Sequence, residues 1–326
     1  ENDPADVVCL FPSASQASTG TSTKPLQITS QGKGASTQPK AAVQNVTEHR
    51  KTLDLCTSLE SNTFGKELSL GSVIHKAASS KMAIVGEVYS TQPLVQLELD
   101  ILQRMVKQVA ATNVASGRVF VLLEHFSQEQ QHLLDSFMAG ELLFEELLEA
   151  YALGDEGHDI EAYRSLLEFA RDSHAVQGVE IKLIGSILPR AMSRMAVSEG
   201  LESALKQAVV SGYVAEDEDC VASDFNYQYF ESLCRGISMF NSTFETNGMA
   251  RRIFPAHVLK ACSIANRLSK SLDDDDGLSK YLVLSGSSHV VYNLGVLERI
   301  FAKRPHLRDV SYRIVAREIE GDVEMG

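Results

Sequence analysis

Short apolar runs that alternate with segments of helical periodicity constrain the fold of this chain more than any other feature. The runs are bounded by polar or glycine residues and are too short for helices, so each one predicts a buried strand. They cover residues 82–88, 118–123, 179–185, 281–284 and 309–316. Strands that alternate with helices predict an α/β fold with a mostly parallel sheet flanked by helices.

The segments between these runs predict helices. Leu94, Leu97 and Ile101 follow Pro93 at helical spacing. Ser127 and Gln130 fit a capping box, and a helix over 189–210 is expected to break near Gly200. A long helix over 227–253 is expected to end before Pro255, which starts another. Because the helical stretches between the strands are longer than simple crossover connections need, we expect a smaller helical subdomain, at about 127–175.

Composition divides the chain into three parts. Residues 1–46 include a stretch rich in Ser, Thr, Gln, Gly and Lys, and such a stretch buries too little apolar surface to offset its ordering entropy. We therefore expect a disordered low-complexity tail over 1–46, an α/β domain over 47–320 and an acidic C-terminal tail over 321–326. The first tail is poor in acidic residues, as organelle transit sequences are, but lacks an Arg-rich amphipathic pattern. An organelle such as a plastid and a soluble intracellular location both stay open.

Charge and cysteine content exclude some classes of protein. The net charge of −13 argues against a general nucleic-acid binder, which needs a basic surface. No apolar run reaches the length of a transmembrane segment. The five cysteines are scattered and include no CxxC, which argues against a disulfide framework or a structural zinc site. Cys262 lies in an apolar helical pattern and is expected to pack as a small core residue.

Two tetrads at strand ends point to a ligand site. Gly86-Glu87-Val88-Tyr89 and Gly286-Ser287-Ser288-His289 both place a metal-binding side chain three residues after a glycine. Glycine lets the backbone turn sharply and lets a ligand come close. Ligands of α/β sheets bind at the carboxyl ends of the strands. We therefore expect Glu87, Tyr89 and His289 to share one site, with Glu124 at the end of a third strand.

The order of these motifs resembles the ChaN-like haem-binding family, within the wider group of Tiki proteases and erythromycin-esterase-like proteins. The resemblance covers residues 81–315 and includes the two tetrads. Further motifs match at residues 123–130, 163–171, 186–190, 249–250 and 295–296. The resemblance implies a parallel sheet, a smaller helical part and a pocket at the strand ends. It also implies haem as ligand and a possible homodimer.

The sequence departs from the family pattern at three polar positions. Tyr89 stands in place of the histidine of the first motif, Ser186 in place of an asparagine, and Asn247 in place of an aspartate. Tyrosine is an axial ligand of haem iron but a poor ligand for zinc. These replacements favour haem binding over metal-dependent hydrolysis, and carriage, storage or regulation over catalytic turnover.

Each candidate site residue has a structural alternative. Tyr89 and His289 are the candidate iron ligands, and each could instead be a packed, hydrogen-bonded side chain. Glu87 and Glu124 would stand close together if their strands pair, where they could bind a cation or share a proton. Arg190 is the candidate partner of a haem propionate. Alternatively, Arg190 forms a salt bridge with Glu87 or Glu124.

Other histidines are assigned to structure. His125 should point to the opposite side of the strand from Glu124 and serve packing or helix entry. His132 and His257 lie in helical segments and are assigned to structure or the surface. Two other functions stay open: a metal-dependent hydrolase with Glu87 or Glu124 as general base and a divalent cation, and an interaction module that kept the fold without its ligand.

Overall fold

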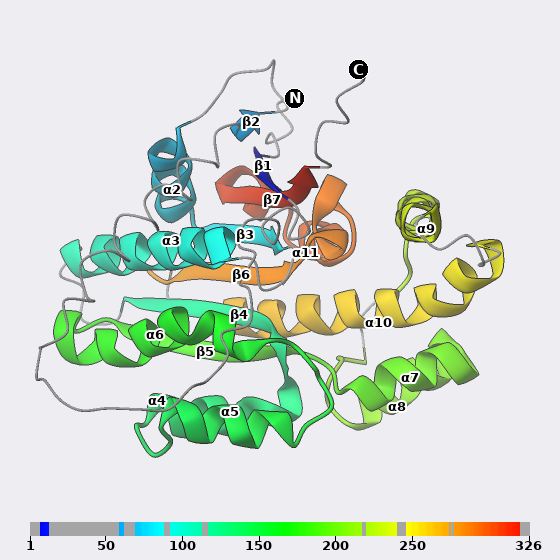
Figure 1. Cartoon of the computed structure of the whole chain (residues 1–326), viewed down its shortest axis with the longest axis horizontal. Helices are drawn as coiled ribbons and strands as arrows, with labels where there is room; N and C mark the ends of the chain where they lie inside the picture. The colour runs from blue at the N-terminus through cyan, green and yellow to red at the C-terminus, as the bar shows by residue number, and fades with distance from the viewer. Residues whose placement is uncertain are drawn as a thin grey trace, which may run out of the picture.

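A mostly parallel sheet forms the centre of the protein (Figure 1). The computed structural model describes residues 7–12, 59–61, 69–87, 92–112, 117–216, 220–239, 246–273, 275 and 277–319. The strands are β1 (Val7–Pro12), β2 (Leu59–Ser61), β3 (Met82–Glu87), β4 (Arg118–Ser127), β5 (Glu180–Ile187), β6 (Lys280–Gly286) and β7 (Ser311–Ile319). They form a 7-stranded sheet in the order β2-β1-β7-β3-β6-β4-β5, in which β2 is antiparallel to β1 and the other pairs are parallel.

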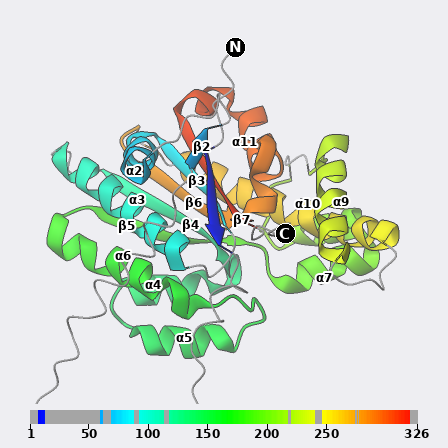
Figure 2. The ribbon, with the colours of Figure 1, turned by 45° about the horizontal axis from the view of Figure 1, so that its top comes forward.

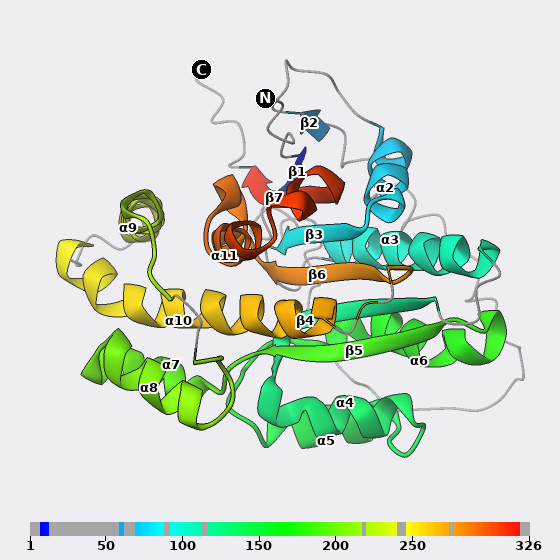
Figure 3. The same cartoon turned by 180° about the vertical axis from the view of Figure 1, so that it is seen from behind.

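Helices cover both faces of the sheet. On one face, a large core joins the sheet to α2 (Leu70–Ser79), α3 (Gln92–Ala111), α4 (Gln131–Met138), α5 (Phe144–Ala152) and α6 (Arg164–Gln177). On the other face, a second core joins it to α10 (Thr246–Asp273) and α11 (Val296–Lys303), which lie in front of the strands in Figure 3. The predicted α/β class, with a mostly parallel sheet between helices, is confirmed.

A group of helices extends beyond the sheet. It consists of α7 (Arg190–Glu199), α8 (Leu201–Val210), α9 (Asp224–Met239) and the first half of α10, gathered on one side of the molecule in Figure 2. A third core of small apolar side chains joins α7 and α8 to α10. The smaller helical subdomain was expected at about 127–175, where the structure has α4, α5 and α6. The helices that extend beyond the sheet follow β5 and are a separate group. Within the described segments, none of the helices combines the length and apolarity that crossing a membrane would take.

Most local predictions are confirmed, but the helices predicted around Pro255 are wrong. The segment 227–253, expected as one helix, belongs to two helices, α9 and α10. The capping box is present, since the backbone N–H of Ser127 donates to Gln130 Oε1 at 3.0 Å. Gly200 separates α7 from α8 with φ of 94°. Pro255, however, lies inside α10 and does not start a helix. Proline removes one helical hydrogen bond, but packing of α10 against the sheet and α7 outweighs this loss.

The N-terminal segment differs in part from the predicted tail. Residues 7–12 form β1, which lies between β2 and β7, next to the edge strand of the sheet. Pairing with an existing edge supplies the backbone hydrogen bonds that the apolar run VVCLF needs, and sequence composition averaged over the tail hid this run. All other residues of the expected tail over 1–46, and the C-terminal tail over 321–326, lie outside the described residues.

Cysteine pairing also differs from the prediction. Cys262 is fully buried in the third core, as expected, but it forms a disulfide with Cys220. The two cysteines are 42 positions apart, and their Cα atoms lie 5.6 Å from each other. Sequence spacing carried no sign of this bond, because the fold brings the segment before α9 onto the middle of α10.

Candidate functional site

The candidate residues gather at the carboxyl ends of three adjacent strands. Glu87 ends β3 and pairs with Gly286 of β6. On the other side of β6, Leu123 pairs with Leu284, and Glu124 follows one residue later. Glu87 and Glu124 were expected to stand close together if their strands pair. The two strands do not pair, because β6 lies between them.

Glu87 and Glu124 face opposite sides of the sheet. Side chains alternate along a strand, so each residue shares a face with the residue two positions before it. Val85 belongs to the core beneath α3 and α6, whereas Leu122 belongs to the core beneath α10 and α11. The strand ends thus carry two polar groups: the α3-side cluster around Glu87 and the α10-side cluster around Glu124.

Glu124 anchors the α10-side cluster. It is 1% exposed, and its Oε2 accepts hydrogen bonds from Ser285 Oγ at 2.5 Å and from the backbone N–H of Gly286 at 2.8 Å. Burial by itself raises the pKa of Glu124. The charges of His289 and Lys260, with these hydrogen bonds, lower the pKa by more and hold it well below the ordinary value. Glu124 is therefore an ionised carboxylate in a buried site.

His289 stands between Glu124 and a second histidine. Its Nε2 lies 3.5 Å from Glu124 Oε1, and its ring stacks on the ring of His257 at 4.2 Å and 12°. Burial lowers the pKa of His289 more than Glu124 raises it, and burial followed by the charge of His289 lowers the pKa of His257. Burial therefore favours the neutral form of both imidazoles. Among the described residues, neither His289 Nδ1 nor His257 Nε2 has a hydrogen-bond partner.

His257 is structural in its packing, as predicted, and its ring also lies directly on a candidate site residue, His289. It comes from α10, more than thirty positions before His289 in the sequence. Phe230 of α9 packs on its other side, with ring centroids 4.6 Å apart. No sequence pattern linked His257 to the second tetrad, since only the packing of α10 on the sheet brings them together.

Glycines shape the turn that carries His289. A Cβ atom on Gly86 would lie 2.5 Å from Val290 Cγ2 and 3.1 Å from Ser287 Cα. Gly295 has φ of +59°, and a Cβ there would lie 2.6 Å from the carbonyl oxygen of His289. Gly86 was expected to let a ligand come close to the backbone. In the structure, the turn that carries His289 fills the space beside Gly86.

The α3-side cluster surrounds Glu87. Tyr163 Oη donates to Glu87 Oε1 at 3.0 Å, and His125 Nε2 lies 3.1 Å from Glu87 Oε2. Glu98 of α3 is 0% exposed, and burial, followed by the nearby charge of Glu87, raises its pKa well above the ordinary value. Burial therefore favours the neutral form of the Glu98 carboxyl. His125 does face away from Glu124, as predicted, but it contacts a candidate site residue in addition to packing.

The loop after α5 is tied to the same cluster. Tyr151 Oη donates to the carbonyl oxygen of His125 at 2.9 Å and accepts the backbone N–H of His158 at 3.2 Å. Burial, followed by the charge of His125, lowers the pKa of His158 to about 4. Sequence reasoning did not single out Glu98, Tyr151 or His158. The only sequence signal of Glu98 and Tyr151 is a polar or aromatic side chain within an otherwise apolar helical pattern, and His158 lies in a loop.

Arg190 and Tyr89 are the remaining candidates. Arg190 is exposed at the start of α7, and its Nη1 donates to the carbonyl oxygens of Asp155 at 2.8 Å and Glu156 at 3.4 Å. These contacts are with the backbone and not with Glu87 or Glu124, the partners of the alternative salt bridge. Tyr89 lies outside the described residues, two positions after the end of β3.

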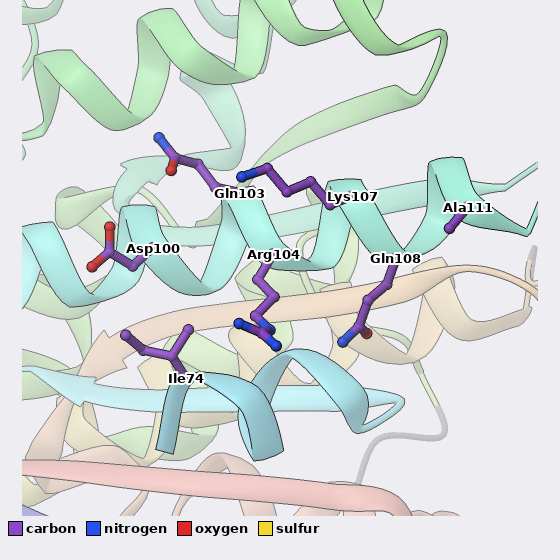
Figure 4. A pocket seen from close by; sticks show the side chains of 7 residues that line it. All are labelled: Ile74, Asp100, Gln103, Arg104, Lys107, Gln108 and Ala111. Atoms are coloured by element: carbon purple, nitrogen blue, oxygen red, sulfur yellow. The ribbon is translucent and has the colours of Figure 1, made fainter. Parts of the chain in front are cut away.

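The described cavities lie away from these clusters. A groove of about 470 Å³ runs between α2 and α3, where Arg104 and Gln108 point towards α2 (Figure 4). Two others border β5 and the junction of α10 with α11. None of the three is lined by Glu87, Glu124 or His289. Within the described part of the chain, no three His, Cys, Asp or Glu side chains are grouped so as to hold a metal ion.

Comparisons with known proteins relate the chain to one family. The family profile described as "Haem-binding uptake, Tiki superfamily, ChaN" matches residues 73–300. A structure titled as cofacial haem binding to ChaN of Campylobacter jejuni has a similar fold, with a TM-score of 0.50 at 15% identity over 80% of this chain and 89% of that chain. A mutant erythromycin esterase in its open conformation gives a TM-score of 0.37 at 8% identity over 74% of this chain and 70% of that chain. No curated protein matches.

Proposed function

Since the chain belongs to the ChaN family of haem-binding uptake proteins in the Tiki superfamily, we propose that it binds haem at the carboxyl ends of its strands. The site lies beside the turn that carries His289, between the end of β3 and α10. Its role is carriage, storage or regulation of haem, with no reaction assigned to the bound group.

The observation that carries this proposal is the state of the His289 ring. Histidines that ligate a metal commonly donate their second ring N–H to a carboxylate, which fixes the tautomer and the orientation of the ring. Glu124 Oε1 lies 3.5 Å from Nε2 of His289 and is placed to take the role of this carboxylate. Nδ1 is then left with a lone pair and, among the described residues, with no hydrogen-bond partner. The residues present therefore fit an axial ligand.

When bound, haem would supply an iron atom that a histidine or tyrosine side chain can ligate. In this chain His289 is the proposed histidine ligand, and Tyr89 is the proposed tyrosine ligand. Glu124 orients the His289 ring. Glu87, held by Tyr163 and His125, fixes the end of β3 and with it the start of the segment that leads to Tyr89.

Arg190 is proposed to hold a haem propionate. Its side chain is exposed and anchored through Nη1 on two backbone carbonyls, so its other guanidinium nitrogen atoms can bind a carboxylate. Arg194, one turn further along α7, makes an ion pair with Asp155 at 2.5 Å and provides a matched control.

Titration of the full chain with ferric haem tests the proposal. We expect a Soret band that saturates, and a binding constant about tenfold weaker or more for His289→Ala and Tyr89→Phe, because each removes an axial ligand. Arg190→Ala should weaken binding less, whereas Arg194→Ala and His132→Ala should bind like the wild type. Equal binding by all variants would refute the ligand assignment. Light scattering on the same samples tests the homodimer, and added zinc or manganese with an ester substrate tests the hydrolase alternative.

A further inference from the structure

His289 is held from two sides by elements distant in the sequence. On one side, the ring of His257 on α10 stacks on its imidazole at 4.2 Å. On the other, Gly295, which precedes α11, packs against the His289 backbone so closely that a Cβ would lie 2.6 Å from the His289 carbonyl oxygen. The position of the ring therefore depends on how α10 and the start of α11 are placed relative to each other.

The segment before α9 fixes the start of α11. Arg299 is 4% exposed, and its guanidinium donates to the carbonyl oxygen of Gly295 at 2.7 Å and to that of Val221 at 3.3 Å. Glu298 accepts the backbone N–H of Ser223 at 3.3 Å and the side-chain amide of Asn226 at 3.2 Å. Residues 220–226 thus form a brace beneath the N-terminus of α11.

The disulfide joins this brace to α10. Cys220 directly precedes Val221, and Cys262 lies on α10 five positions after His257. A single covalent bond therefore links the two supports of His289. Apart from this bond, Cys262 makes apolar contacts in the third core, where Cys220 is also buried.

We propose that the Cys220–Cys262 disulfide is a redox-sensitive latch that holds His289 in its haem-binding position. The proposal rests on the proposed haem site and adds a form of regulation to it. A dithiol reductant opens the latch: its thiolate attacks Cys220 Sγ, the S–S bond breaks, and Cys220 and Cys262 each become a thiol while the reductant becomes a disulfide. Both cysteines are buried. Cys220 is the sulfur attacked because it is 3% exposed and lies outside any helix, whereas Cys262 is 0% exposed within α10.

The reduced chain is expected to bind haem less tightly. Without the bond, the brace and α10 are joined by non-covalent contacts, so the His289 ring samples positions in which its Nδ1 is misplaced. A coupling of this kind typically changes an affinity about tenfold. Cys234 of α9 offers a matched control, since it is buried and carries a free thiol in the described part of the chain.

The test compares haem binding by the full chain in two redox states and in four variants. Protein is reduced with dithiothreitol, freed of reductant without exposure to air, and titrated with ferric haem beside the oxidised protein. The variants are Cys220→Ser, Cys262→Ser, the double variant and Cys234→Ser. Far-ultraviolet circular dichroism checks that each one is folded. Mass spectrometry after alkylation counts the thiols at Cys220 and Cys262, and NMR of the histidine rings follows His257 and His289 without haem.

We expect reduction and each of the first three variants to weaken haem binding by the same factor, about tenfold, because all of them remove one bond. Cys234→Ser should match the wild type, and the ring signals of His257 and His289 should shift on reduction. Unchanged haem affinity in the double variant, alkylated Cys220 in oxidised protein, or unmoved ring signals would each overturn the latch. If oxidised wild type binds no haem, the proposed function fails, and the ring signals still decide whether the disulfide positions His289.

Discussion

Removing the Glu124 carboxylate should cost more stability than any other single change at the strand ends. In the folded protein this carboxylate is 1% exposed and accepts two hydrogen bonds, from Ser285 Oγ at 2.5 Å and the Gly286 N–H at 2.8 Å. Hydrogen bonds to a charged group contribute about 1.5–3 kcal/mol each, so the two together contribute about 3–6 kcal/mol. Breaking a buried charged contact by removing one partner costs about 3–5 kcal/mol. We therefore expect about 4 kcal/mol for Glu124→Ala.

Two milder variants separate the parts of this effect. Glu124→Gln keeps the volume and one acceptor oxygen, so we expect about 2 kcal/mol, roughly one hydrogen bond to a charged group. Ser285→Ala removes one donor and should cost about 1.5–3 kcal/mol. Because the two side chains are in contact, the double variant Glu124→Gln with Ser285→Ala should cost less than the sum of the single variants.

Urea unfolding followed by circular dichroism measures these free energies, and its pH dependence provides a second test. The pKa of Glu124 is lower in the folded protein than its ordinary value of 4.5. Its contribution to stability is therefore complete above pH 4.5 and is lost as the pH falls below that value. The difference in the free energy of unfolding between the wild type and Glu124→Gln should therefore shrink as the pH falls below 4.5. A Glu124→Ala variant within 1 kcal/mol of wild type, or a gap that does not change between pH 7 and pH 3, would refute the reasoning.

Three further outcomes are expected. Glu98→Gln should raise the free energy of unfolding at pH 7, because burial raises the folded-state pKa of Glu98 above its unfolded value. This gain in stability should fade as the pH falls towards 4.5. A variant less stable than the wild type at pH 7 would contradict the prediction. Replacing Cys220 and Cys262 by alanine should lower stability by about 4 kcal/mol from the entropy of a 42-residue loop, measured by urea unfolding, with an unchanged midpoint as the contrary result. Gly295→Ala combines a φ of +59° with a Cβ 2.6 Å from a carbonyl oxygen, whereas Gly140→Ala has a φ of +74° and open space around the Cβ. Gly295→Ala should therefore lower the melting temperature more than Gly140→Ala. Equal decreases in melting temperature would count against an effect of the close contact.

Local patterns in the sequence predicted the parts of the fold that depend on neighbouring residues. Apolar runs marked β3, β4, β5 and β6 to within a few residues, because a buried strand needs apolar side chains on both faces. Ser127 with Gln130 and the break at Gly200 were predictable for the same reason, since caps and helix ends are decided by a few adjacent residues. At Pro255 this local reasoning failed, because tertiary packing holds α10 continuous through the proline.

The sequence by itself determined that Glu87 and His289 stand at the end of a strand, because strand ends are local features of the chain, and it placed Glu124 near the end of β4, which continues to Ser127. Only the tertiary structure decided which of them meet. The insertion of β6 between β3 and β4 divides the two carboxylates, and strand alternation turns them to opposite faces. His257 on His289 and Cys220 on Cys262 come together through the packing of α10. Contacts between distant segments depend on the whole arrangement of helices on the sheet, so no local pattern could reveal them.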